Sequence, residues 1–342
     1  MNTEWRPPAG WGAIETLDAH TAGEPLRLIT KGLPPIPGDT ILKKRQFFRN
    51  NFDFIRTGLM WEPRGHADMY GAVLTEPVSE EGDFGVFFLH NEGYSTMCGH
   101  AVIALAKIIL DTGMVKKEGK NPEIKMDTPA GLVKAVAYRE EGRVTQVSFL
   151  NVPSFVYLKE QKIQIPDIGG IHYDIAFGGA FYAFCKADEL NVSLKPEHYA
   201  RLIHLGRSIK KAVQNSVDIS HPLEEELGFL YGTIITGPPE KPCNHSRNVC
   251  VFADGEVDRS PTGTGVSARA ALHYSRGELK KGETLVIESL IGTEFKVSVK
   301  EVTTFGPYKA VIPKVTGSAS ITGTSRFYFD PEDPLKKGFI LR

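Results

Sequence analysis

The chain has 342 residues, a hydrophobic fraction of 41% and a formal net charge of −1. This length suits two domains, and the near-zero charge gives no electrostatic field that would attract nucleic acid or an anionic membrane. No segment reaches the roughly 18 to 20 apolar residues that span a bilayer, and the N-terminus lacks the pattern of a secretory signal, so we expect a cytoplasmic protein without nucleic-acid or membrane partners.

Segments rich in β-branched and aromatic residues, bounded by Gly, Pro or Asp, predict many strands. In chain order, the predicted strands are Ala13–Leu17, Gly71–Leu74, Gly85–Leu89, Leu132–Tyr138, Val144–Leu150, Ala180–Cys185, Gly232–Thr236, Val249–Phe252, Thr284–Ser289 and Glu294–Val299. Apolar residues at helical spacing predict helices over His100–Leu110, Pro196–Val213 and Val266–Ser275. Gly113 and Gly277 follow the first and third helices, where a C-terminal cap is expected. These elements predict a mixed α/β chain rich in sheet, without the regular alternation of a doubly wound fold.

The four cysteines, at positions 98, 185, 243 and 250, form no CxxC pair and no cluster with zinc-site spacing. They are too sparse for a disulfide scaffold, so we expect free thiols. Cys185, Cys243 and Cys250 are interpreted as small hydrophobic side chains. Composition alone favours the same interpretation for Cys98, but its place in the sequence MCGHA at a predicted helix start favours a functional role.

One internal similarity joins the two halves of the chain. The segments Cys98-Gly99-His100-Ala101-Val102 and Thr262-Gly263-Thr264-Gly265-Val266 share a small reactive side chain, a glycine, any residue, a small residue and a valine. Each segment opens a predicted helix, and about half the chain separates them. The pattern suggests two similar halves, each of which offers a helix N-terminus.

A helix N-terminus exposes unpaired N–H groups and a partial positive charge, which makes it a site for a carboxylate. A cysteine at such a position is expected to have a lowered thiol pKa. Two such helices facing one cleft would hold an amino-acid carboxylate and stabilise the negative charge that forms when the Cα proton leaves. No lysine can be assigned to pyridoxal phosphate, so helix ends are the available alternative to that cofactor. Two simpler interpretations stay open. His100 could be a helix cap or a core residue, and the segment Asp258-Arg259-Ser260-Pro261 could be a loop with a helix cap.

Seven motifs occur in order along most of the chain. They are Asp18-Ala19-His20-Thr21-Ala22-Gly23-Glu24-Pro25, Glu62-Pro63-Arg64-Gly65-His66, Asp68-Met69-Tyr70-Gly71, Asn91-Glu92-Gly93-Tyr94, Met97-Cys98-Gly99-His100, Phe177-Gly178-Gly179-Ala180-Phe181 and Asp258-Arg259-Ser260-Pro261-Thr262-Gly263-Thr264-Gly265. Together they resemble the proline racemase family. The resemblance implies an α/β (α+β) fold of two similar, pseudo-symmetric domains, each a sheet wrapped around a central helix, as in diaminopimelate epimerase, with the active site in the cleft between them. It also implies an enzyme without cofactor or metal, and suggests a homodimer. We place the first domain at residues 1–150, joined by 322–342, and the second at 151–321.

The racemases of this family use two cysteines, one per domain, on opposite faces of the substrate. Cys98 matches the first cysteine, but Thr262 occupies the position of the second. A threonine hydroxyl is a poor proton carrier because its pKa is far above that of a thiol, and threonine here resembles the trans-3-hydroxy-L-proline dehydratases of the family. In that substrate the Cα hydrogen and the hydroxyl share one ring face, so one base is sufficient.

We therefore predict a cofactor-independent carbon–oxygen lyase (hydro-lyase). The Cys98 thiolate takes the Cα proton, water leaves, and the enamine tautomerises to Δ1-pyrroline-2-carboxylate. Either Cys98 itself or His100 protonates the leaving hydroxyl.

The resemblance also implies which residues bind the small imino acid. The substrate contacts are Gly99 and His100 at the first helix start, Gly263 and Thr264 at the second, Asp258 at the ring nitrogen, and Tyr70 and Phe252 as aromatic walls. The Tyr70 hydroxyl either contacts the 3-hydroxyl of the substrate or serves packing alone. His20, Glu24 and His66 receive no role, and Asp18 with His20 on one strand face is interpreted as a structural hydrogen-bond network.

Three alternatives stay open. A hydroxyproline epimerase or proline racemase would need Thr262 or a bound water to deliver a proton to the opposite face. A non-catalytic imino-acid-binding protein would not need the Cys98 thiol. An isomerase or another lyase on the same fold would act on a different acid, whereas the Asp258 motif and the aromatic pair favour a small cationic imino acid.

Overall fold

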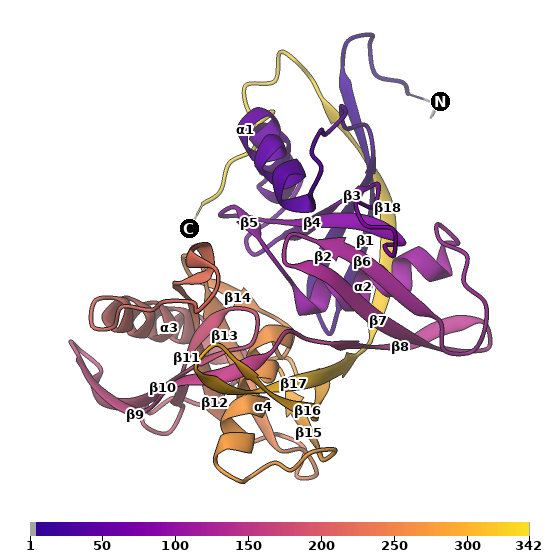
Figure 1. The fold of residues 1–342 in the computed structure, drawn as a ribbon. Helices are drawn as coiled ribbons and strands as arrows, with labels where there is room; N and C mark the ends of the chain where they lie inside the picture. The colour runs from indigo at the N-terminus through magenta and orange to yellow at the C-terminus, as the bar shows by residue number, and fades with distance from the viewer. Residues whose placement is uncertain (1–4, 342) are drawn as a thin grey trace.

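The computed structural model describes residues 5–341, which form two lobes of mixed α/β structure (Figure 1). The strands up to residue 150 are β1 (Gly12–Thr21), β2 (Glu24–Lys31), β3 (Tyr70–Thr75), β4 (Phe84–His90), β5 (Tyr94–Ser95), β6 (Glu123–Thr128), β7 (Gly131–Glu140) and β8 (Arg143–Leu150). The later strands are β9 (Ser154–Ile165), β10 (Gly169–Phe177), β11 (Phe181–Lys186), β12 (Leu230–Gly237), β13 (Ser246–Phe252), β14 (Glu256–Asp258), β15 (Thr284–Glu288), β16 (Glu294–Phe305), β17 (Tyr308–Gly317) and β18 (Ala319–Phe329). The α-helices are α1 (Ile41–Met60), α2 (Gly99–Asp111), α3 (Tyr199–Gln214) and α4 (Gly263–Ser275), and two 3-10 helices, η1 and η2, cover Pro196–His198 and Glu225–Leu227.

The two halves repeat one pattern of strand pairing. Along β1–β2–β3–β4–β6–β7–β8, successive pairs are antiparallel, parallel, antiparallel, parallel, antiparallel and antiparallel. The series β10–β11–β12–β13–β15–β16–β17 follows the same order of pairings. Parallel neighbours need a crossover connection, and α1 and α3 lie in the first crossover of each half while α2 and α4 lie in the second. The repeat confirms the predicted fold class of two similar α/β halves.

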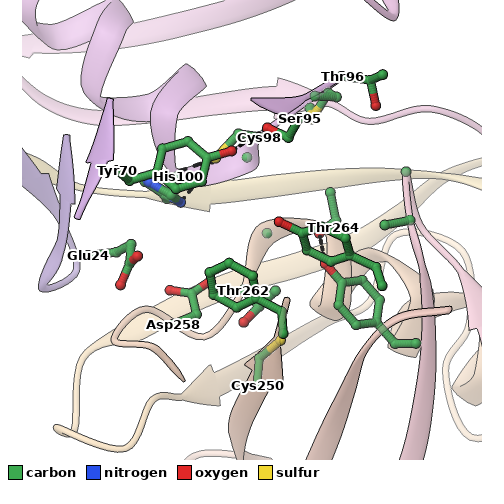
Figure 2. Close-up of a pocket in the computed structure, with 18 of the residues that line it drawn as sticks. Glu24, Tyr70, Ser95, Thr96, Cys98, His100, Cys250, Asp258, Thr262 and Thr264 are labelled. Atoms are coloured by element: carbon green, nitrogen blue, oxygen red, sulfur yellow. Dashed lines mark hydrogen bonds between the residues drawn. The ribbon is translucent and has the colours of Figure 1, made fainter. Parts of the chain in front are cut away.

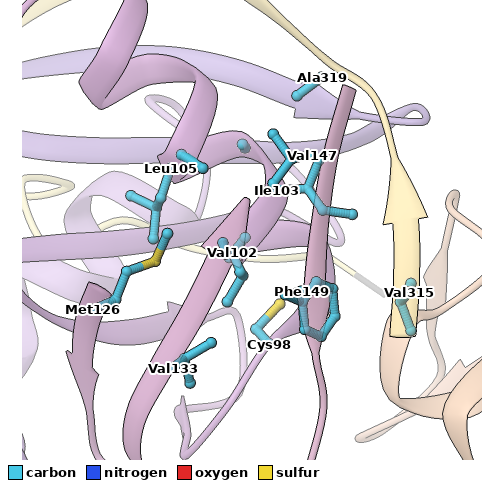
Figure 3. Packing of buried hydrophobic residues seen from close by; sticks show 14 of the residues in the cluster. Cys98, Val102, Ile103, Leu105, Met126, Val133, Val147, Phe149, Val315 and Ala319 are labelled. Carbon is cyan, nitrogen blue, oxygen red and sulfur yellow. The ribbon is translucent and has the colours of Figure 1, made fainter. Parts of the chain in front are cut away.

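Helix α2 lies inside the sheet of the first half because it is apolar on every side. All of its residues are buried except Lys107 and Asp111. Its side chains share one hydrophobic core with residues of the surrounding strands (Figure 3). The labelled members of this core are Cys98, Val102, Ile103, Leu105, Met126, Val133, Val147, Phe149, Val315 and Ala319. The helix predicted over His100–Leu110 is therefore present, and it is buried.

The strands of the two halves belong to one continuous hydrogen-bonded sheet, whose second half closes on itself. Strand β9 pairs with both β10 and β17 and so closes this second half. Strand β8 pairs with β17, which links the two halves. The C-terminal strand β18, yellow in Figure 1, pairs along β1 in the first lobe. The domain limits at residues 150 and 321 stay a prediction.

All ten predicted strands and all three predicted helices are present in the structure. Gly113 and Gly277 have φ angles of 72° and 73°, as expected for residues that end a helix in the left-handed region. Helix α1 has no counterpart in the prediction, because polar residues interrupt its apolar stripe and its regular geometry breaks at Phe52 (φ −132°, ψ 19°). Within residues 5–341, no helix combines the length and hydrophobicity needed to cross a bilayer.

Candidate active site

A cavity lies where the two halves meet, and all nine predicted site residues line it. They are Tyr70, Cys98, Gly99, His100, Phe252, Asp258, Thr262, Gly263 and Thr264. Figure 2 shows the first half contributing Cys98 and His100 from one side, with Asp258 and Thr262 on the other. The structure thus brings together residues that are far apart in the sequence, and their individual roles stay predictions.

The two helix starts face each other in direct contact. The first intrahelical bonds run from Val102 N–H to the Cys98 carbonyl (3.0 Å) and from Val266 N–H to the Thr262 carbonyl (2.8 Å). The N–H groups that precede these bonds point out of the helix ends, where they favour an anion. A Cβ atom added to Gly99 would lie 2.9 Å from the Cα of Gly263, and the reverse is also true. The approach of the two helix ends therefore requires glycine at both positions.

Cys98 is the N-cap of α2, and its Sγ lies 3.1 Å from Nδ1 of His100. Burial raises the pKa of the Cys98 thiol, and the carboxyl groups of Asp258 and Glu24 add to the shift, while the Ala101 backbone N–H opposes it. The lowered thiol pKa predicted from the helix start is therefore wrong. The helix end acts in the expected direction, but removing the thiolate from water has the larger effect.

His100 is a neutral side chain at the same helix start. Burial lowers the pKa of His100 to about 3, so the imidazole carries one N–H donor and one acceptor nitrogen. The Thr21 hydroxyl donates to the His100 backbone carbonyl at 2.7 Å, which anchors this turn to β1. The Tyr70 ring meets the imidazole edge-on with a centroid distance of 4.7 Å, and the Tyr70 hydroxyl is hydrogen-bonded to Ser95. The contact of Tyr70 with a substrate hydroxyl stays a prediction.

Thr262 is the N-cap of α4 and has φ 68° and ψ 98°. This left-handed conformation is rare for a β-branched residue, and such strain persists only where the surroundings fix it. The Thr262 backbone N–H donates to the Ser260 hydroxyl at 3.1 Å. Its own Oγ1 is buried without a hydrogen-bond partner among the described residues. The second helix start therefore presents a lone hydroxyl where the first presents a thiol.

Three polar side chains gather at one end of the cavity. Ligand atoms of Glu24, His100 and Asp258 all lie within 4.8 Å of one another. Burial raises the pKa of Asp258 to about 6, against the opposing effect of hydrogen bonds from Ser260. Burial and the charge of Asp258 raise the pKa of Glu24 well above its usual value. Carboxyl oxygens and an imidazole could hold a metal ion, and the same groups suit an organic ammonium.

Aromatic residues of the second half form the remaining wall. Phe252 stacks on Tyr231 with a centroid distance of 5.4 Å, and the Tyr182 hydroxyl is hydrogen-bonded to Thr264 at 2.7 Å. Sequence reasoning missed several residues that line the cavity. These residues include Glu24, Ser95, Tyr182, Tyr231 and Cys250. Glu24 had a signal, since it lies in a recognised motif, and so did the cavity-lining residues Tyr94, Met97, Gly179 and Ala180.

Other expectations from the sequence have mixed outcomes. Cys185 and Cys250 are buried, which agrees with their interpretation as small hydrophobic side chains, whereas Cys243 is exposed. Asp18 pairs with Arg27 at 3.0 Å, and His20 accepts a hydrogen bond from the Gly23 N–H, so both side chains of this strand have structural partners. His66 does not line the cavity.

Comparisons with known proteins agree with this architecture. The family model described as proline racemase matches residues 16–340. A trans-3-hydroxy-L-proline dehydratase from Colwellia psychrerythraea is 47% identical over 99% of this chain and 96% of its own length. A 3-hydroxyproline 2-epimerase from Burkholderia multivorans is 44% identical over 96% and 98% of the two chains. The crystal structure of a hydroxyproline epimerase from Agrobacterium vitis with bound trans-4-hydroxy-L-proline superposes with a TM-score of 0.90 at 30% identity, covering 98% and 96% of the two chains. The chain belongs to the proline racemase family.

Proposed function

We propose that the protein is a trans-3-hydroxy-L-proline dehydratase, a hydro-lyase that works without a cofactor. The observation that carries the proposal is the combination of one thiol, at Cys98, with one hydroxyl, at Thr262, at two helix starts that meet in a single cavity. This arrangement supports proton removal from one face of a ring only. The 47% identical dehydratase from Colwellia psychrerythraea supports the choice of substrate.

The charges of the substrate match those of the cavity. Its carboxylate binds at the converging helix ends, where the first-turn N–H groups of Gly99 and Gly263 stabilise negative charge. Its ring ammonium binds Asp258, which is ionised at neutral pH because its pKa is about 6. The aromatic pair of Phe252 and Tyr231 packs against the ring carbons. In this pose Cα faces Cys98.

Elimination then needs a single proton carrier. The Cys98 thiolate takes the Cα proton, the electrons of the Cα–H bond form the Cα=C3 double bond, and the C3–O bond breaks. In trans-3-hydroxy-L-proline the hydroxyl leaves from the face that Cys98 occupies, so the new thiol returns the proton and water departs. The enamine then gains a proton at C3 and loses one at nitrogen to give Δ1-pyrroline-2-carboxylate.

Substrate binding itself promotes the thiolate. The charge of Asp258 raises the pKa of Cys98, in addition to the effect of burial. A bound ammonium offsets that charge and so favours the thiolate. Nδ1 of His100, 3.1 Å from Sγ, accepts a hydrogen bond from the thiol and orients it, because the Pro25 carbonyl engages the single imidazole N–H. The reactive thiolate therefore forms mainly when the substrate is present.

Epimerisation is the second candidate function, since the Burkholderia multivorans relative is named a 3-hydroxyproline 2-epimerase. It requires a proton donor on the face opposite to Cys98. Thr262 faces the cavity from that side, but a hydroxyl exchanges protons far less readily than a thiol. Dehydration is therefore the better supported activity.

Proton NMR of the purified protein in D2O tests the proposal. Trans-3-hydroxy-L-proline, trans-4-hydroxy-L-proline and L-proline are incubated in parallel samples. We expect conversion of the 3-hydroxy compound to Δ1-pyrroline-2-carboxylate and no epimer in the other two samples. If trans-3-hydroxy-L-proline stays unchanged while trans-4-hydroxy-L-proline is epimerised or L-proline is racemised, the protein is not a dehydratase. That result would establish epimerisation or racemisation instead.

The proposal also includes a cytoplasmic homodimer. It rests on the family resemblance and on the free cysteines of the chain. Analytical ultracentrifugation at several protein concentrations tests the dimer directly.

A further inference from the structure

We infer that Glu24 is a second ligand of the substrate's ring nitrogen and that it acts with Asp258 from the other side of the cleft. The inference rests on the proposed function for the identity of the substrate, and it adds a residue that determines specificity for a cyclic secondary ammonium.

The position of Glu24 supports this role. Glu24 begins β2 in the first half, whereas Asp258 ends β14 in the second, and oxygen atoms of the two lie within 4.8 Å. The Glu24 side chain is 0% exposed to solvent, yet it lines the cavity. Figure 2 shows Glu24 and Asp258 at the same end of the site, on the side of His100.

The hydrogen bonds of Glu24 leave one oxygen for a ligand. Its Oε2 accepts the backbone N–H of Arg259 at 2.7 Å. Its Oε1 is buried and has no hydrogen-bond partner within the part of the chain that the structure describes. A buried carboxyl oxygen without a partner is unfavourable, because it has lost its hydrogen bonds to water. A ligand that donates a hydrogen bond at this point would remove that penalty.

A cyclic imino acid carries two N–H groups on its ammonium, and both need acceptors in a buried site. Asp258 supplies one acceptor. The Glu24 Oε1 atom supplies the second at a separation that a single nitrogen can bridge. A primary ammonium would carry a third N–H, and an uncharged ring atom would leave the Glu24 Oε1 atom without a hydrogen-bond donor. The pair therefore selects a secondary ammonium.

The same backbone segment holds both carboxyl groups in place. Arg259 follows Asp258, and its side chain pairs with Asp68 of the first half at 2.7 Å. Tyr199 of the second half donates to the same Asp68 carboxylate at 2.8 Å. These contacts, with the bond from Arg259 N–H to Glu24, fix the two acids relative to each other across the cleft.

The surrounding charges fit a cation that arrives with the substrate. The charged and titratable groups that face Glu24 are Asp68, Cys98, His100, Cys250, Asp258 and Arg259. Burial, together with the charge of Asp258, favours the protonated form of Glu24 when no cation is bound. An ammonium between the two carboxyl groups supplies the positive charge that allows Glu24 to ionise.

Ligands with and without a ring nitrogen test the inference. Binding is measured by calorimetry in the Cys98→Ala background, which cannot turn the substrate over. The ligands are trans-3-hydroxy-L-proline, L-proline and tetrahydrofuran-2-carboxylate, which has a ring oxygen instead of the ammonium. We expect Glu24→Gln to weaken binding of the imino acids about tenfold or more and to change binding of the ether acid by less than about twofold.

Glu256→Gln is the matched control, because Glu256 is also 0% exposed but does not line the cavity. This variant should not change the ratio of imino-acid to ether-acid affinity. Equal weakening of all ligands by Glu24→Gln, or no weakening, would overturn the inference. If L-proline binds but trans-3-hydroxy-L-proline does not, the proposed substrate is wrong, while the ratio of L-proline to ether-acid affinity still decides the role of Glu24.

Discussion

Helices α2 and α4 occupy equivalent places in the two halves but differ in how they are held. Helix α2 packs with apolar side chains on all sides. Helix α4 carries buried polar side chains: Asn151 donates to the Ser267 hydroxyl at 2.8 Å, and Arg269 donates to Ser246 and Asn248. Hydrogen bonds fix a helix in one orientation, whereas apolar packing fixes its depth in the sheet. Hydrogen bonds therefore fix the orientation of α4, whereas α2 is held mainly by apolar packing.

The two helix starts differ in a more consequential way. Both contribute a glycine and a set of backbone N–H groups, so the capacity to hold a carboxylate is present twice. Cys98 has an extended backbone with φ −146°, while Thr262 has φ 68°. Only Cys98 brings a thiol, which is a better proton carrier than the Thr262 hydroxyl. Anion binding depends on the backbone and is duplicated, whereas proton transfer depends on a side chain and is confined to one half.

Among the variants that test this difference between the helix starts, loss of the Cys98 thiol should lower activity most. We expect Cys98→Ser to lower kcat by about a thousandfold, because a hydroxyl is a far weaker base than a thiolate. Cys250→Ser is the control, since Cys250 also lines the cavity but lies in the second half. Its activity should stay within about threefold of the wild type if it has no part in proton transfer. Steady-state assays of dehydration measure both variants, and a fully active Cys98→Ser variant would refute the assignment of the base.

Disruption of the contact between the helix starts should cause the second largest loss of activity. An alanine at position 99 places its Cβ 2.9 Å from the Cα of Gly263, which forces the helix ends apart. Displacement of catalytic groups by about 1 Å is expected to lower kcat/KM by about a hundredfold. Gly93→Ala is the matched control, because a Cβ there meets no atom within 4 Å. Full activity of Gly99→Ala would show that the contact is not needed.

Conversion of the second start into a copy of the first should have a smaller effect. Thr262→Cys places a thiol on the face opposite to Cys98. We expect exchange of the Cα hydrogen of L-proline in D2O, with formation of D-proline, at a rate about tenfold or more above that of the wild type. NMR detects both products. A variant that still dehydrates but shows no exchange would mean that the backbone at position 262 aims the side chain away from the substrate.

The sequence predicted those parts of the molecule that depend on local pattern. The buried helix from Gly99, the short strands and the two glycine-led helix starts follow from hydrophobic periodicity and capping chemistry. Helix α1 was missed because contacts with the sheet, and not a regular apolar stripe, stabilise it. The pKa of Cys98 was predicted in the wrong direction, because the depth of burial is a property of the folded structure.

Residues that act through long-range contacts were also beyond the sequence pattern. Glu24 and Asp258 are far apart in the chain, and only the folded structure brings their oxygens within 4.8 Å. Cys250 and Tyr231 lie on β13 and β12, outside the recognised motifs, and they line the cavity only because these strands lie beside α4 in the folded structure. Family resemblance located the motifs, whereas the folded structure showed which of their side chains meet.

The smallest expected effect is a dependence of kcat/KM on pH. It separates the contribution of Asp258 in the second half from that of Cys98 in the first. Asp258 must be ionised to hold the ammonium, and its pKa is about 6. A carboxyl group is ionised above its pKa, so activity is lost on the acid side, and kcat/KM should fall by a further factor of about ten for each pH unit below 6. The Asp258→Asn variant should have low kcat/KM at all pH values and no change of slope near pH 6. Since Cys98 remains in that variant, any change of slope that persists near pH 6 belongs to another group and would refute this assignment. Binding of tetrahydrofuran-2-carboxylate to the wild type, which involves no ammonium, should not weaken between pH 7 and pH 5.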